Sequence, residues 1–144
     1  MHTPFAPSPR RRFGGALVAL LGLSGLGLTD HSAAQGGSDA VTLETARAEL
    51  EAGRAVVIDI REPMEHATGV AAGARLLPMR QLGARLAEIP TDAAQSVLLI
   101  CNTQNRSKAT LKALRERGYG HVRYVEGGMS EWARRGWPMV PPTR

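Results

Sequence analysis

The protein's single cysteine stands where the sequence could support nucleophilic chemistry. Cys101 follows the apolar run 97–100, which predicts a strand buried on both faces, and a polar stretch and an amphipathic helix pattern come after it. In such a strand–loop–helix turn, several backbone N–H groups converge on one point. A sulfur atom there would be held as a thiolate by the amides of residues 102–106, by the positive end of the helix and by Arg106. We therefore predict that Cys101 is a reachable, catalytic nucleophile.

The loop after the cysteine is polar and basic, which is typical of the surroundings of reactive cysteines. A free cysteine after a buried strand can also be an inert small hydrophobic residue, and that alternative stays open. The polar loop favours the reactive thiol, because such residues do not belong in an apolar core. The residues that we expect to bind substrate or shape the loop are Asn102, Thr103, Gln104, Asn105, Arg106 and Ser107.

This loop resembles the active-site loop of the rhodanese (sulfurtransferase) family, in which a cysteine is followed by four residues, an arginine and usually a serine. Cys101, Arg106 and Ser107 match that pattern. Gln104 stands where the family commonly has glycine, which takes a positive φ at little cost. Either the loop follows a slightly different path here, or Asn105 adopts the left-handed turn.

Two residues of the loop have expected roles of their own. Arg106 either steers an anionic donor or braces the loop against a carboxylate, with Asp59 or Glu62 as its partner. Ser107 is expected to cap the helix that follows.

Other segments extend the resemblance across nearly all of residues 35–144. The stretch that begins at Asp59 and Arg61 resembles the family's run of aspartate, any residue, arginine and then a glutamate–aromatic pair, with His66 in place of the aromatic residue. Segment 125–138 resembles the family's closing pattern of two glycines, a tryptophan and a glycine-x-proline. Asp59 and Arg61 are expected to pin the loop after their strand rather than to do chemistry.

The resemblance implies transfer of sulfur. The Cys101 thiolate would attack the outer sulfur of a donor such as thiosulfate, release sulfite and keep the sulfur as a persulfide. The expected partners are thus a small anionic sulfur donor and an acceptor, which is a thiol, cyanide or a protein. No cofactor is implied, and no metal site is expected because His66 and His121 lack partners at metal-ligand spacing.

Two other functions stay open. A cysteine-dependent phosphatase also uses a loop between a cysteine and an arginine, but the related phosphatases have five residues between the two and this chain has four. A non-catalytic rhodanese-like module that carries or senses persulfide, or only binds a partner, is the alternative that the missing loop glycine keeps open.

Predicted strands alternate with predicted helices through short links, which indicates an α/β fold with a parallel sheet and helices on both faces. We expect three layers and about five strands. A helix is expected over 82–89, where three apolar residues share one face and Pro90 ends it. Ligands of such sheets bind beyond the carboxyl ends of the strands, so Cys101, Asp59 and segment 126–128 are expected on one rim. The expected strands are 41–43, 55–60, 75–77, 97–100 and 122–125.

Residues 1–34 have the order of an export signal. Three arginines and Phe13 precede an uncharged apolar run of 15 residues, 14–28, and the small residues 32–34 offer a cleavage site; the arginines also resemble a twin-arginine signal. The run is shorter than the roughly 18–20 residues of a membrane-spanning helix, so no stable membrane insertion is expected after cleavage. We expect an exported, periplasmic protein with one mature domain, 35–144. An uncleaved, anchoring N-terminus is the alternative.

The net charge and the single cysteine further limit the substrates and the classes of function that we expect. The net charge is +5 for the whole chain, and it falls to +3 for residues 35–144 because three arginines and one aspartate lie before them. This mild excess of positive charge favours small anionic substrates. The sequence has no basic segment with interspersed aromatic residues, so nothing in it indicates nucleic-acid binding. A single cysteine excludes an intramolecular disulfide, and it counts against a dithiol oxidoreductase, which needs a second, resolving cysteine.

Overall fold

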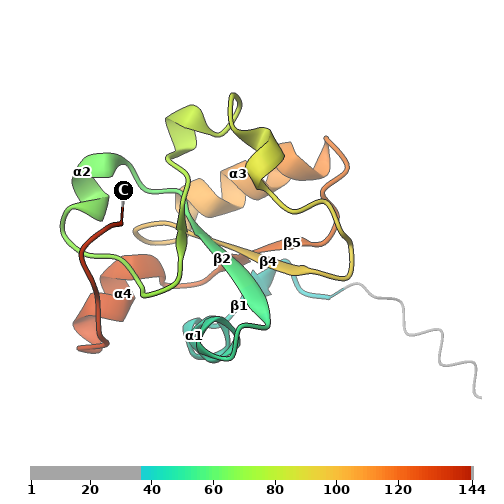
Figure 1. Cartoon of the computed structure of the whole chain (residues 1–144). Coiled ribbons are helices and arrows are strands. Elements are labelled where there is room, and N and C mark those ends of the chain that lie inside the picture. The colour runs from blue at the N-terminus through green and yellow to red at the C-terminus, as the bar shows by residue number, and fades with distance from the viewer. Residues whose placement is uncertain (1–36, 144) are drawn as a thin grey trace, which may run out of the picture. The chain divides into compact units, whose positions relative to one another are not determined.

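The computed structural model of the chain describes residues 37–143 (Figure 1). The predicted export signal and its cleavage site lie outside these residues, so both stay predictions. The described part forms a sheet with helices packed against it, and the cysteine loop follows the carboxyl end of the central strand.

The sheet contains five strands in the order β1-β5-β4-β2-β3. Every pairing between them is parallel, as the alternation of strands and helices predicts. The central strand β4 pairs with β2 on one side and with β5 on the other. The residue that follows β4 therefore lies at the carboxyl ends of the strands, near the middle of the sheet. The strands are β1 (Ala40–Val41), β2 (Ala55–Asp59), β3 (Arg75–Leu76), β4 (Ser96–Ile100) and β5 (Val122–Val125).

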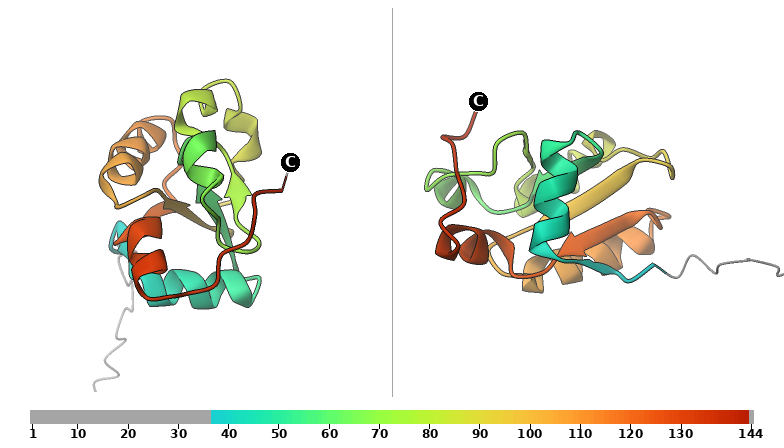
Figure 2. Two further views of the ribbon diagram at one scale, coloured as in Figure 1. Left: turned by 90° about the vertical axis from the view of Figure 1, so that its left-hand side faces the viewer. Right: turned by 90° about the horizontal axis from the view of Figure 1, so that it is seen from below.

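Helices cover both faces of the sheet, which completes the predicted three layers. Helices α1 (Leu43–Glu51) and α4 (Gly128–Arg134) lie against one face, and α3 (Asn105–Arg115) lies against the other (Figure 2). The short helix α2 (Pro63–His66) begins just after the end of β2, with Pro63 at its first position.

The side chains of β4 divide the core into two parts. Leu98 and Ile100 pack with the residues of α1 and α4, whereas Val97 and Leu99 pack with those of α3. All four are at most 1% exposed, which confirms that the strand is buried on both faces. Alternation of this kind fixes the direction of every side chain along the strand, including the residue that follows it.

The helix predicted over 82–89 is wrong. The structure has two short 3-10 turns in this region, η1 (Met79–Gln81) and η2 (Leu86–Glu88). Pro90 forces Ile89 into an extended conformation (φ −83°, ψ 120°). Gly83, which lies between the two turns, disfavours a continuous helix. Ile89 still packs into the core, so the apolar spacing correctly indicates burial but not the type of element.

The first predicted strand is also shorter than expected. Thr42 is the N-cap of α1, and its Oγ1 accepts a hydrogen bond from the N–H of Thr45 at 3.2 Å. The strand therefore ends at Val41, because the chain turns into the helix at Thr42.

Candidate active site

The thiol lies at the carboxyl end of the central strand. Cys101 points to the same face as Val97 and Leu99, because it continues their alternation, and it is 1% exposed. Its Sγ is 3.1 Å from Ser107 Oγ. This hydroxyl is the hydrogen-bond partner of the sulfur within residues 37–143, and the ring of amides around the sulfur stays a prediction. The thiol is more enclosed than the sequence predicts.

The backbone of the cysteine loop is anchored on the N-terminus of α4. The N–H groups of Met129 and Ser130 donate to the carbonyl oxygens of Cys101 (2.8 Å) and of residue 102 (2.9 Å). Gly128 permits this approach: its φ is +62°, and a Cβ on it would lie 2.2 Å from the carbonyl oxygen of Thr103. Only glycine fits here, since any side chain would displace the loop. The cysteine and the segment after β5 thus meet on one rim, as expected.

Gln104 adds a side-chain contact to this anchor. Its Oε1 accepts a hydrogen bond from the N–H of Gly127 at 3.1 Å. Its φ is −155°, so the position uses extended backbone and not the left-handed turn that glycine favours. The alternative that Asn105 takes that turn is wrong, because Asn105 is the first residue of α3. The backbone passes through Gln104 without a left-handed turn, and the side-chain amide of Gln104 fastens the loop on Gly127.

Arg106 holds the other end of the loop through Glu65. Its two terminal nitrogens lie 2.7 and 2.6 Å from the two carboxylate oxygens of Glu65, which is a bidentate ion pair. The hydrogen bonds from Arg106 lower the pKa of Glu65 from 4.5 to about 2. The expected partners Asp59 and Glu62 are wrong, because Asp59 is bonded to Arg61 and Glu62 accepts from the N–H of residue 80.

Sequence reasoning missed Glu65 although a local signal for it exists. Glu62 and Glu65 are three residues apart on either side of Pro63, and they form the capping box of α2. The Glu65 carboxylate accepts from the N–H of Glu62 at 2.9 Å, which fixes its orientation toward α3. The capping-box spacing could have shown that this carboxylate is held in place, but only the fold shows that it faces Arg106.

Ser107 is not the helix cap that the sequence predicts. Gln104 occupies the N-cap position without a capping side chain, and Ser107 is the third residue of α3. Its buried hydroxyl is shared between the cysteine Sγ and the carbonyl oxygen of Gln104, at 3.1 and 3.3 Å. The side chain turns toward the sulfur because the first turn of α3 packs directly over the end of β4.

Asp59 and Arg61 form a buried ion pair beside the loop that follows α2. Arg61 Nη2 is 2.7 Å from Asp59 Oδ2 and 2.8 Å from the carbonyl oxygen of Gly69. His66 lies next to the pair, with its Nε2 3.4 Å from Asp59 Oδ1. These contacts hold the chain between β2 and β3 in place, and neither residue contacts the cysteine loop through a hydrogen bond recorded among residues 37–143.

The remaining loop residues lie at the surface. Asn102, Thr103 and Asn105 are exposed, whereas Gln104 and Arg106 are half-buried. Within residues 37–143 no three His, Cys, Asp or Glu side chains are grouped so that they could hold a metal ion. In the same part of the chain, no helix combines the length and the apolar character needed to cross a bilayer.

A parallel sheet whose central strand leads into a cysteine loop, with an arginine at the start of the next helix, is typical of a rhodanese-like domain. The sequence model of the rhodanese-like domain family matches residues 42–135, and the chain therefore belongs to this family. The match includes all the elements that anchor the loop.

Individual proteins agree with this assignment. A sulfurtransferase of Allochromatium vinosum is 39% identical over 87 residues, which are 60% of this chain and 79% of that protein. A rhodanese-related protein of Thermoplasma volcanium has 28% identity and a TM-score of 0.60, over 72% of this chain and 98% of that one. A human single-domain sulfurtransferase has 25% identity and a TM-score of 0.59, over 69% of this chain and 98% of that one.

Proposed function

We propose that this protein is a sulfurtransferase that moves a sulfane sulfur from a donor such as thiosulfate to a thiophilic acceptor through a persulfide on Cys101. One observation carries the proposal. The chain's single cysteine is placed at the edge of the sheet, 3.1 Å from a buried hydroxyl, in a loop that is fastened on α4 at one end and on α2 at the other. Membership of the rhodanese-like family supports the transferase class.

The first step transfers sulfur to the enzyme. The Cys101 thiolate attacks the outer sulfur of thiosulfate, a new S–S bond forms, and the donor's own S–S bond breaks with its electron pair leaving on sulfite. In the second step an acceptor such as cyanide attacks the terminal sulfur and leaves as thiocyanate, which restores the thiolate. The Ser107 hydroxyl can donate to the charged sulfur, and the positive end of α3 favours negative charge at this place.

Donor access requires movement of the loop. Since Cys101 is 1% exposed, a donor reaches the sulfur only when the loop that follows it moves. The Arg106–Glu65 pair then serves as the fixed end of the moving segment, which favours bracing as the role of Arg106. Loop motions of this size are fast compared with ordinary turnover.

The enclosed thiol also favours a second candidate, a non-catalytic rhodanese-like module that carries or senses persulfide. A buried sulfur suits slow exchange of one sulfur atom better than repeated turnover. The two candidates differ in rate and not in the first chemical step.

The test is to incubate the protein with thiosulfate and to measure its intact mass, with Cys101→Ser as the matched variant. We expect the mass of one added sulfur atom on the wild type, release of thiocyanate on addition of cyanide, and neither in the variant. The variant should keep its free energy of unfolding within about 1 kcal/mol, because serine is close to cysteine in size. A wild type that folds but never gains sulfur would exclude both candidates, and a persulfide that forms but turns over only once would select the carrier.

We also propose that the protein is exported to the periplasm by its first 34 residues. The support is the order of arginines, apolar run and small residues in the sequence. Expression of the full chain in a Gram-negative host, followed by fractionation and N-terminal sequencing, should recover from the periplasm a protein that begins at Gln35. Recovery of the uncleaved chain from the membrane fraction would support an anchoring N-terminus instead.

A further inference from the structure

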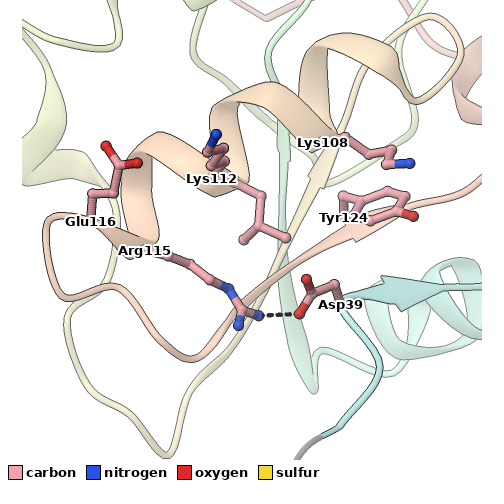
Figure 3. Close-up of a pocket in the computed structure, with 7 residues that line it drawn as sticks. Asp39, Lys108, Lys112, Arg115, Glu116 and Tyr124 are labelled. Atoms are coloured by element: carbon pink, nitrogen blue, oxygen red, sulfur yellow. Dashed lines mark ion pairs between the residues drawn. The ribbon is translucent and has the colours of Figure 1, made fainter.

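A pocket of about 370 Å³ lies beside α3 (Figure 3). It is bounded by α3, by β5 and by the residue that precedes β1. Its α3 residues follow the helical spacing i, i+3, i+4 and i+7, so they share one face of the helix. The lining residues are Asp39, Lys108, Leu111, Lys112, Arg115, Glu116 and Tyr124.

The basic side chains of the pocket differ in whether they are paired with a carboxylate. At its far end Arg115 Nη2 lies 2.7 Å from Asp39 Oδ1, and Glu116 is close by in the chain. At its near end Lys108 Nζ lies 5.8 Å from the centre of the Tyr124 ring (Figure 3). Among residues 37–143 neither Lys108 nor Lys112 forms an ion pair with a carboxylate. Two positive charges are therefore left for a ligand, Lys108 at the near end and Lys112 in the last turn of α3.

This near end adjoins the candidate active site. The N–H of Lys108 donates to the carbonyl oxygen of Gln104 at 2.8 Å, so the first pocket residue belongs to the helical turn that completes the cysteine loop. From Lys108 to Arg115 the helix rises by about 10 Å. An extended segment of about 3 residues therefore spans the α3 side of the pocket, and a few further residues lead toward the cysteine loop.

We propose that this pocket is the docking surface of the sulfur acceptor, and that the acceptor is an acidic polypeptide segment that carries a cysteine. Its carboxylates pair with Lys108 and Lys112, and a neighbouring apolar side chain lies against Leu111 and the Tyr124 ring. The inference rests on the proposed sulfur transfer, because it names the partner that takes sulfur from Cys101. The acceptor thiolate attacks the terminal sulfur of the persulfide, forms a new S–S bond and leaves Cys101 as a thiolate.

The charge pattern favours a polypeptide over nucleic acid. Asp39 and Glu116 would repel a phosphate backbone that continued along α3, whereas a polypeptide can carry neutral or basic residues at that end. The aromatic ring and the buried leucine are of no use to a small inorganic anion, but they suit an apolar side chain next to the carboxylates.

The experiment uses the full chain, loaded with sulfur from thiosulfate, and two synthetic peptides. Both peptides have one cysteine and a four-residue spacer, followed by Glu-Leu-Glu in the first and Gln-Leu-Gln in the second. We expect the acidic peptide to have a kcat/KM about fivefold higher at low ionic strength, and the preference to fall as salt is added. In K112E the preference should disappear or reverse.

Two controls separate the docking surface from general charge and from the chemistry. Arg117 is an exposed cation just past α3 that does not line the pocket, and R117E should keep the preference for the acidic peptide. Cyanide is the small acceptor, and its kcat/KM should be the same in the wild type and in K112E.

The outcomes distinguish the two proposals. Equal kcat/KM for both peptides in the wild type, or an equal loss of preference in R117E and K112E, overturns the docking surface while transfer to cyanide continues. Absence of sulfur loading, with no thiocyanate from cyanide, overturns the proposed function and the docking surface together.

Discussion

Two arginine–carboxylate pairs lie on the functional side of this protein, and they differ in burial and in what they hold. Arg61 and Asp59 are 4% and 0% exposed, and they fix the chain between β2 and β3. Arg106 and Glu65 are 30% and 33% exposed, and they fix the start of α3 and one end of the cysteine loop. The same chemistry therefore stabilises the fold in the first pair and positions a reactive loop in the second.

Burial is the physical reason for this difference. A charge left without its partner in the interior cannot be solvated, so the loss of one partner destabilises the protein strongly. A half-exposed charge is solvated by water when its partner is lost, and the cost in stability is small. Loss of the half-exposed pair should therefore change the position of the loop more than the stability of the fold, whereas loss of the buried pair should destabilise the fold.

The largest effect on stability is expected for Asp59→Asn. Arg61 would stay buried without an opposite charge, and the free energy of unfolding should fall by about 3 kcal/mol. Urea unfolding measures the change. Glu51→Gln removes the partner of Arg47 on the surface of α1 and should cost less than about 0.5 kcal/mol. If the two variants lose the same amount, burial does not distinguish the ion pairs.

Gly128→Ala tests the anchor of the loop on α4. The new Cβ would lie 2.2 Å from the Thr103 oxygen at a φ of +62°, so the loop must move and we expect a loss of about 2 kcal/mol together with most of the sulfur transfer. Gly136 is the matched control, because its φ is +67° and nothing lies within 4 Å of its Cβ position. Gly136→Ala should cost about 1 kcal/mol and leave transfer intact. Equal effects on transfer would contradict the close approach.

Glu65→Gln separates positioning from stability in the half-exposed pair. We expect kcat/KM for thiosulfate to fall about tenfold, because the loop loses its fixed end, while the free energy of unfolding falls by only about 1 kcal/mol. An unchanged kcat/KM would show that the pair does not position the loop.

The same variant has a pH signature. The hydrogen bonds from Arg106 are the main reason why the pKa of Glu65 is about 2 in the folded protein, below its ordinary value of 4.5. Because the folded pKa is the lower one, the pair's contribution is fully present above about pH 4.5 and is lost as the pH falls toward 2. The difference in unfolding free energy between the wild type and Glu65→Gln should therefore be constant from pH 5 to pH 8, by urea unfolding, and should shrink below that range.

The smallest effect is expected for Gln104→Leu. This variant keeps the size of the side chain but leaves the Gly127 N–H without its acceptor, which should cost about 0.5 kcal/mol because the site is half-exposed. The loop should open more often, so the alkylation rate of Cys101 by iodoacetamide should rise. Asn102→Leu changes an exposed loop residue whose side chain has no recorded partner in residues 37–143, and its alkylation rate should stay near that of the wild type.

Much of the fold could be predicted from local patterns. Buried strands at 55–59 and 97–100 and the alternating helices indicate a parallel α/β sheet, because both signals depend on the spacing of apolar residues. The error at 82–89 has the same origin, since apolar spacing reports burial and says little about whether a segment between two prolines forms a helix.

The site was predicted less completely than the fold. The order of Cys101, Arg106 and Ser107 indicated the loop, but the partner of Arg106 and the direction of the Ser107 side chain depend on how α2 and α3 pack. Glu65 is 41 residues before Arg106 in the chain, and no local pattern joins them. The thiol is enclosed because Cys101 continues the alternation of side chains along β4. That alternation is visible in the sequence, but the polar residues after Cys101 indicated an exposed thiol instead.

By itself, the sequence determined the class of fold, the family and the identity of the one possible thiol nucleophile, because these depend on apolar periodicity and on which residues are present. Only the tertiary structure decided how the loop is held: by a carboxylate from α2, by two amides of α4 and by the amide of Gln104. Contacts between segments far apart in the chain arise from packing geometry, which residue spacing does not encode.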